Sequence, residues 1–245
     1  MRTKAIFLAW GVALGLVASS ASAQTADDVL KHADDVLHAA KDLVATSSMT
    51  ITAKGGAKSE RTLQLWQKGT DRRMIKFLSP AAQKGIGFLS LPGDNMSLYL
   101  PAYKKVRRIA AHVKNGKFAG TDYSYEDLEA KRYAELWTPT IKQQQGGEYV
   151  LVLTPKPGTQ SDYSELEIHV RASDWYPTEV VFYRKGEQVK RMTATDVRPE
   201  KGVLMAHRTE MRDLKSGSVT TMQVQKVEVD SGLADDVFTD RNLQR

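Results

Sequence analysis

The chain has 245 residues, with 35 Lys and Arg, 29 Asp and Glu, and no cysteine. Without cysteine it can form no disulfide, and it offers no thiol for lipid attachment. The net charge of +6 is modest, so composition gives little support for a polyanionic partner such as nucleic acid.

The first residues have the pattern of an export signal. Two basic residues precede an apolar stretch at Ala5–Ala18, and Ala21-Ser22-Ala23 fits a small-residue cleavage site. A membrane anchor is the alternative, but a bilayer span needs about 20 apolar residues, which is more than this stretch provides. We therefore expect residues 1–23 to be a cleaved signal peptide and residues 24–245 to form a single periplasmic domain that is soluble after cleavage.

The mature chain is expected to begin with a helix and to continue as strands. Apolar residues recur at helical spacing over Thr25–Leu43. From Ser47 onward the period changes to two, and Glu165–Arg171 is the clearest case because Leu, Ile and Val alternate there with charged or polar residues. The other expected strands are Met49–Ala53, Thr62–Lys68, Arg73–Leu78, Gly87–Leu91, Ser97–Leu100, Lys105–Ile109, Glu148–Thr154, Thr178–Arg184, Gln188–Val197, His207–Leu214 and Val219–Val229.

The strand pattern predicts a mainly β fold with few helices. About eleven strands joined mostly by hairpins are too many for a flat sheet, so we expect an incomplete antiparallel β-barrel with a concave face. Such a face must be filled by its own side chains, by a helix laid across the opening, or by a ligand. Besides the first helix, short helical segments are expected near Tyr125–Leu128 and Ala234–Phe238.

The sequence carries no recognisable catalytic signature. The five histidines lack zinc-site spacing, and HExxH, GxSxG, P-loop and GxGxxG patterns do not occur. Adjacent carboxylates at Asp27-Asp28, Asp34-Asp35, Glu126-Asp127 and Asp235-Asp236 are interpreted as residues that stabilise helix starts. We therefore expect a binding protein rather than an enzyme, with no catalytic residue, metal or cofactor.

Aromatic, Gly, Pro and basic residues are concentrated between Phe77 and Leu128. Large apolar residues in and around this segment are candidates for lining a cavity, with ordinary core packing as the alternative for each one. The candidates are Leu63, Leu65, Trp66, Phe77, Phe88, Leu98, Leu100, Phe118, Tyr123, Tyr125 and Trp137.

A basic cluster lies within the same segment. Its candidates for contact with a lipid head group or a partner are Lys104, Lys105, Arg107 and Arg108. Lys114 and Lys117 follow shortly after them. A solvated loop is the alternative interpretation of the cluster.

Several segments, in order along the chain, together resemble a known family. They are Phe77-Leu78-Ser79-Pro80, Lys84-Gly85-Ile86-Gly87-Phe88-Leu89, Leu98-Tyr99-Leu100-Pro101, Arg107-Arg108-Ile109, Phe118–Leu128, Tyr149–Pro155, Phe182-Tyr183 with Lys190, and Asp235–Thr239. As an ordered set they resemble the outer-membrane lipoprotein-sorting-like proteins, distant relatives of the periplasmic carrier LolA. The resemblance implies a LolA-like half-barrel closed by helices over an apolar cavity that takes acyl chains or another lipid-like ligand.

Two functions are consistent with the residues and the resemblance. The favoured one is a periplasmic carrier that binds lipid, or the acyl chains of lipoproteins, and transfers them without chemistry between envelope membranes or membrane-bound partners. Such a carrier would work with an inner-membrane exporter and an outer-membrane acceptor. The alternative is an accessory or sensor module of an envelope exporter, and it predicts an interior filled by the protein's own side chains.

Overall fold

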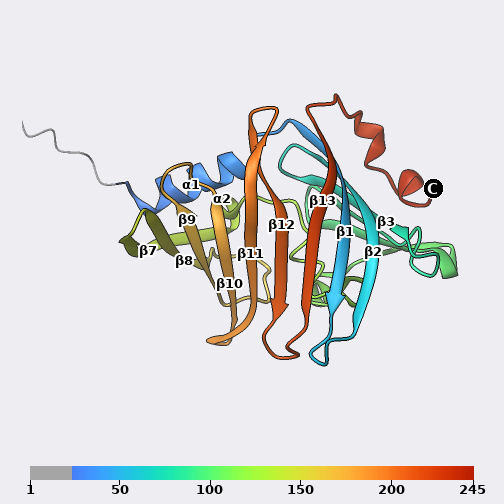
Figure 1. Cartoon of the computed structure of the whole chain (residues 1–245), viewed down its shortest axis with the longest axis horizontal. Helices are drawn as coiled ribbons and strands as arrows, with labels where there is room; N and C mark the ends of the chain where they lie inside the picture. Colours follow the sequence, from blue (N-terminus) through green and yellow to red (C-terminus); the bar gives the residue numbers. More distant parts are fainter. Residues whose placement is uncertain (1–23) are drawn as a thin grey trace, which may run out of the picture.

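One antiparallel sheet dominates the computed structural model, which describes residues 24–245 (Figure 1). Within these residues the sheet has 13 strands in the order β6-β5-β4-β3-β2-β1-β13-β12-β11-β10-β9-β8-β7. Strands β6 and β7 are its two edges, so the sheet is not closed into a barrel. The expected signal peptide lies outside the described residues.

The sheet consists of two runs of consecutive strands, joined where β1 pairs with β13. The first run is β1 (Asp42–Thr52), β2 (Lys58–Lys68), β3 (Arg72–Ser79), β4 (Gly87–Leu91), β5 (Asn95–Leu100) and β6 (Lys105–Arg108). The second run is β7 (Trp137–Gln145), β8 (Glu148–Pro155), β9 (Glu165–Arg171), β10 (Pro177–Arg184), β11 (Glu187–Glu200), β12 (Val203–Asp213) and β13 (Val219–Val229). Between β7 and β8, Gly146 and Gly147 both have positive φ, as a type I′ hairpin turn requires.

The helices are few, as expected; the segment expected near Ala234–Phe238 forms a 3-10 turn, whereas Tyr125–Leu128 forms a turn and not a helix. The helices are α1 (Ala26–Leu37), α2 (Tyr133–Leu136) and α3 (Asp240–Leu243), with 3-10 turns η1 (Pro101–Tyr103), η2 (Ala111–Val113), η3 (Phe118–Gly120) and η4 (Asp235–Val237). Helix α1 begins with a capping box in which Thr25 and Asp28 exchange backbone and side-chain hydrogen bonds. No helix within residues 24–245 has the length and apolar character needed to cross a bilayer.

Helix α1 is shorter than the predicted Thr25–Leu43. The carboxylate of Asp42 accepts hydrogen bonds from the backbone N–H groups of Ser231, Gly232 and Leu233 at 2.8, 2.9 and 3.1 Å. These bonds hold the start of β1 against the end of β13. Tertiary pairing therefore overrides the helical spacing of the last apolar residues in the predicted helix.

The sheet has thirteen strands rather than about eleven. Every segment expected as a strand forms one, and β7 is the strand that was not predicted. Most residues of β7 are exposed, and three consecutive glutamines end it. An edge strand with so little burial has no apolar alternation for a sequence pattern to reveal.

The two faces of the sheet are covered by different parts of the chain. On the concave face, Val29, Leu30 and Ala33 of α1 belong to the large core cluster together with residues of the strands. On the convex face, Phe238 and Leu243 of the C-terminal segment form a smaller cluster with β3 and β4. Figure 1 shows α1 and α2 beside β7–β10, with the C-terminal segment at the opposite end of the sheet.

Candidate binding cavity

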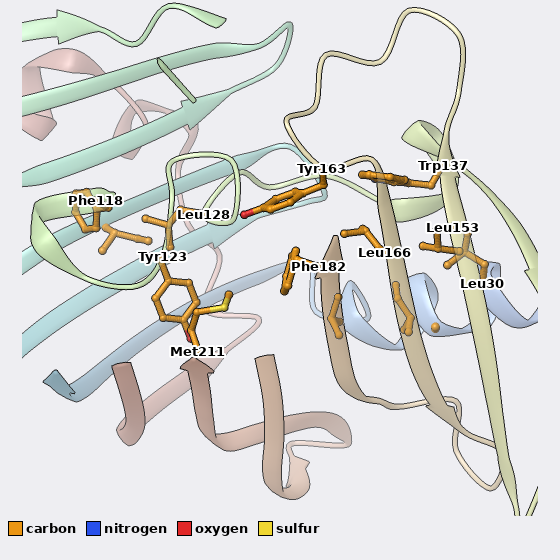
Figure 2. Packing of buried hydrophobic residues seen from close by; sticks show 14 of the residues in the cluster. Leu30, Phe118, Tyr123, Leu128, Trp137, Leu153, Tyr163, Leu166, Phe182 and Met211 are labelled. Atoms are coloured by element: carbon orange, nitrogen blue, oxygen red, sulfur yellow. The ribbon is translucent and has the colours of Figure 1, made fainter. Parts of the chain in front are cut away.

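A cavity of about 620 Å³ lies on the concave side of the sheet. Its floor consists of inward-facing residues of β1–β3 and β9–β13, and its rim includes α2 and segments 126–131 and 156–161. In Figure 2, Tyr123 and Leu128 face Tyr163 and Phe182 across this space. The volume falls within the range of roughly 300–1,000 Å³ that is typical of small-molecule pockets.

Methionine is prominent in the cavity wall. Met49, Met192, Met211 and Met222, from four neighbouring strands, line the floor beside leucines and aromatic residues. The methionine side chain is unbranched and polarizable, so it adapts to contacts of varied shape. The sequence analysis did not identify these residues, although their alternation along each strand places them on the inward face.

A buried polar network holds one side of the cavity. The carboxylate of Asp127 accepts hydrogen bonds from Lys190 Nζ, the Tyr163 hydroxyl and the Ser124 backbone N–H, each at 2.7 Å. The side chains of Asp127 and Lys190 are only 2% and 8% exposed. Burial raises the pKa of the Tyr163 hydroxyl, which keeps it protonated as a donor. The network joins the 124–128 turn to β11 across the hollow.

The predicted helix-stabilising role is wrong for Glu126-Asp127. Asp127 neutralises a buried lysine, and Glu126 accepts hydrogen bonds from the Ser161 hydroxyl and from the Asp162 backbone N–H. Asp34 does stabilise a helix start, but the helix is α2 and not its own. It accepts from the backbone N–H groups of Tyr133 and Ala134 at 2.9 and 2.8 Å.

Arg73 of β3 places a guanidinium group on the cavity wall. Its Nε and Nη2 donate to Gln67 Oε1 at 3.1 and 2.6 Å, and its Nη1 donates to the Leu128 carbonyl at 3.2 Å. Burial lowers the pKa of Arg73 to about 10, so the group remains charged at neutral pH. Its immediate neighbour Arg72 lies on the other face and pairs with Asp235 at 2.9 Å.

The structure divides the predicted cavity residues into three sets. Those that line the cavity are Leu63, Leu65, Phe118, Tyr123 and Trp137. Phe77, Phe88 and Tyr125 pack beside Phe118 in the core, with ring centroids 5.3–6.1 Å from that ring.

The remaining candidates lie farther from the hollow. Leu98 is part of the packing around the large core, and Leu100 belongs to neither hydrophobic cluster. Trp66 follows the cavity residue Leu65 on β2, so strand alternation turns it to the convex face, where it packs with Leu89 and its neighbours.

The basic cluster also separates into two sets. Lys104, Lys105, Arg107 and Arg108 are exposed at the β6 edge of the sheet, and the Arg107 guanidinium lies 5.4 Å from the ring centroid of the exposed Tyr103. The two later lysines have structural partners. Lys114 is buried between Asp94 and Glu129 at 3.2 and 3.6 Å, and Lys117 pairs with Asp122 and Asp213 at 3.2 and 2.8 Å.

The fold and the cavity define a class of protein, the open antiparallel half-barrel with a hollow concave face. A protein-family model described as that of an uncharacterized protein matches residues 69–245. A search of curated protein sequences finds no match. The family match and the structural similarities described next bear out the resemblance found in the sequence.

Three solved structures share this fold. A putative outer-membrane lipoprotein-sorting protein domain from Vibrio parahaemolyticus is 24% identical, with a TM-score of 0.78 over 88% of this chain and 98% of that one. A DUF1329 family protein from Desulfovibrio piger is 25% identical, with a TM-score of 0.84 over 89% and 97%. A LolA superfamily protein from Nitrosomonas europaea is 20% identical, with a TM-score of 0.76 over 90% and 100%. The chain belongs to the family that this model describes, a LolA-like DUF1329 group, and the three structures show that it shares their fold.

Proposed function

We propose that the protein is a periplasmic carrier that holds a lipid, or the acyl chains of a lipoprotein, in the concave cavity without converting it chemically. The observation that carries this proposal is the apolar hollow of about 620 Å³. Protein interiors are close-packed and contain few voids larger than a water molecule. The side chains around an apolar hollow lack packing contacts on the side that faces it. A guest in the hollow supplies these contacts, and the dispersion energy of the new contacts favours its binding.

The wall chemistry favours a hydrocarbon guest. Leucine, methionine and aromatic residues form most of the floor. The Asp127 carboxylate does not need a polar guest, because it already accepts hydrogen bonds from Lys190 and Tyr163. Each methylene group moved from water into such a site contributes about 0.8 kcal/mol. An acyl chain that cannot cross the aqueous space unaided is therefore well suited to this cavity.

The transfer step is supported by the exposed basic cluster at the β6 edge, Lys104, Lys105, Arg107 and Arg108. A cation close to an anionic membrane surface contributes about 1 kcal/mol to binding. We assign these residues to contact with lipid head groups, or with an acidic face of a membrane-bound donor or acceptor. The printed description of the Vibrio relative as a putative lipoprotein-sorting domain is consistent with such a role.

The alternative function is an accessory module whose interior is filled by its own side chains. A large hollow on the concave face favours the carrier, because a module that only docks partners has no use for an unfilled interior. The two functions differ in whether lipid is bound to the protein when it is purified.

Lipid analysis of protein purified from its own periplasm tests the proposal. We expect native mass spectrometry and solvent extraction to detect stoichiometric lipid. Met222→Trp should abolish it by filling the floor, whereas Gln223→Trp, on the opposite face of β13, should retain it. Repeated recovery of ligand-free wild-type protein that also ignores fluorescent fatty acids would contradict carriage.

A further inference from the structure

Arg73 is a charged group on the cavity wall whose hydrogen-bond partners are all neutral. A guanidinium carries five N–H donors, and three hydrogen bonds from Arg73 reach an amide oxygen and a backbone carbonyl. Among residues 24–245, no Asp or Glu forms an ion pair with it. Two of the donors therefore have no hydrogen-bond acceptor, and the positive charge has no carboxylate partner, within the part of the chain that the structure describes.

Most other charged groups around the cavity are matched within the protein. Asp127 pairs with Lys190 at 2.7 Å. Lys131 pairs with Asp94 and, at 2.9 Å, with Glu129. These carboxylates are therefore engaged by other cations, while the Glu126 carboxylate accepts from the Ser161 hydroxyl and the Asp162 backbone N–H, and Glu135 is exposed.

Two further cations line the rim. Arg132 pairs with Asp35, and Lys156 donates to the Ala134 carbonyl at 2.6 Å. Lys156 belongs to the 156–161 segment at the mouth, whereas Arg73 lies two residues before the wall residue Ile75 on β3 and opposite Gln67 of β2. Arg73 is thus the cation of the floor that lacks a counter-charge.

Arg73 is partly buried, and a charge that is partly withdrawn from water without a counter-charge is unfavourable because the ion loses some of its hydration. An anion that enters the cavity would relieve that cost. The planar guanidinium matches carboxylate and phosphate groups in geometry, and hydrogen bonds between ionised partners are the stronger kind.

We infer that the guest is an anionic amphiphile, a hydrocarbon chain that ends in a carboxylate or a phosphate, and that Arg73 holds its acidic end. The chain then extends over the floor formed by Met49, Met211 and Met222. This inference rests on the proposed carrier function, adds the chemical class and the orientation of the guest, and selects a free anionic lipid over the ester- and amide-linked chains of a lipoprotein. A neutral acyl ester or amide would leave Arg73 without its partner.

Three amphiphiles with the same sixteen-carbon chain test the inference on the processed wild-type protein: palmitate, hexadecyl phosphate and 1-hexadecanol. In displacement of a bound fluorescent fatty acid, at least one of the two anions should bind roughly 10- to 100-fold more tightly than the alcohol. The tighter of the two anions identifies carboxylate or phosphate as the natural group.

Arg73→Met should remove this preference while the affinity for 1-hexadecanol changes little. Arg73→Lys keeps the charge but loses the planar fork, and should give an intermediate preference. The matched control is Arg72→Met, one residue away on the convex face, which should keep the wild-type preference.

The outcomes separate this inference from the carrier proposal. If all three amphiphiles bind the wild type equally and Arg73→Met changes none of them, Arg73 is not an anion site, although carriage stands. If none of the three binds, the carrier proposal itself fails. If Arg73→Met does not fold, the comparison of the three head groups on the wild type still tests whether the cavity prefers an anion.

Discussion

The two faces of the N-terminal strands differ in how completely other side chains cover them. On the convex face, Met74 and Leu89 are sealed by Phe238 and Leu243, and Leu243 packs so closely that a Cβ on Gly87 would lie 2.7 Å from its Cδ1. On the concave face, Arg73 and Ile75 of β3, the strand that carries Met74, border a hollow of about 620 Å³. The difference shows that the hollow is not a consequence of sheet curvature alone, since a short covering segment can fill the space over a strand completely.

The two faces also differ in how charge is used. The convex segment is attached by ion pairs of Lys68 and Arg72 with Asp235, whose side chain is 65% exposed. The concave cover depends on the buried pair of Asp127 and Lys190. Where a hollow prevents close packing, a desolvated polar network holds the covering turn in place. The predictions below compare the two faces, starting with the largest expected effect.

Removing the buried carboxylate should have the largest effect. Asp127→Ala leaves the Lys190 ammonium uncompensated in the interior, so we expect a loss of about 3–5 kcal/mol in the free energy of unfolding. Asp235→Ala, which removes the exposed carboxylate on the convex face, should change stability little. Urea denaturation of both variants measures the difference, and equal losses would remove the electrostatic contrast between the faces.

Side-chain truncation should be costly on the sealed face and mild at the hollow. Leu243→Ala deletes a fully buried side chain and should cost about 3 kcal/mol, whereas Met222→Ala, at a wall that already lacks neighbours on one side, should cost less than about 1.5 kcal/mol.

A double-mutant cycle sharpens this test. Gly87→Ala should destabilise the wild type through its clash with Leu243, and less so in the Leu243→Ala background. Thermal denaturation of the four proteins gives the coupling. If Gly87→Ala lowers stability equally in both backgrounds, Leu243 does not pack closely against Gly87.

Acid should weaken the concave cover through Asp213, which pairs with Lys117, a residue whose backbone is bridged to Ser124 of the covering turn. Burial alone would raise the pKa of this carboxyl, but hydrogen bonds from Lys117 and the Ser216 backbone hold the pKa at about 2. A depressed pKa contributes stability that is fully present above about pH 4 and is lost as the pH falls toward 2.

We expect this contribution to be about 1–2 kcal/mol. Asp213→Asn should reduce the slope of the free energy of unfolding against pH between pH 4 and 2, measured by urea denaturation across that range. A profile that keeps the wild-type slope in the variant would show that Asp213 does not stabilise the cover.

The smallest effect on stability is expected at the basic cluster. Lys104→Gln combined with Arg107→Gln should leave the free energy of unfolding within about 0.5 kcal/mol of wild type, because both side chains are exposed. Binding to vesicles that contain anionic phosphatidylglycerol should weaken by about fivefold per charge. Lys58→Gln with Lys215→Gln, two exposed lysines on the β1–β2 and β12–β13 hairpins, is the matched control, and an equal loss there would indicate a general charge effect.

Much of the fold could be predicted from local patterns. Alternation located Glu165–Arg171 and Val219–Val229 with the bounds that β9 and β13 have in the structure. The end of α1 could not be predicted, because the residues that remove Asp42 from the helix are almost 190 positions away. The edge strand β7 escaped prediction because its exposed residues carry no apolar period.

The candidate site was less predictable than the fold. Leu65 and Trp66 are both large and apolar, yet one faces the hollow and the other the convex cluster. Arg72 and Arg73 are identical in type, and only the sheet places one beside Asp235 and the other on the cavity wall. Alternation separates each pair into opposite faces, but it does not say which face is hollow.

The sequence by itself determined the antiparallel strands, the hairpin turns and the absence of a long helical core, because period-two alternation and turn glycines act over a few residues. Only the tertiary structure decided where the hollow lies and which charges are left unmatched on its wall. Met49 and Met222 are paired across β1 and β13 and meet at one cavity floor, although 173 positions separate them in the chain. A cavity is defined by the space that distant segments fail to fill, and no local pattern records that space.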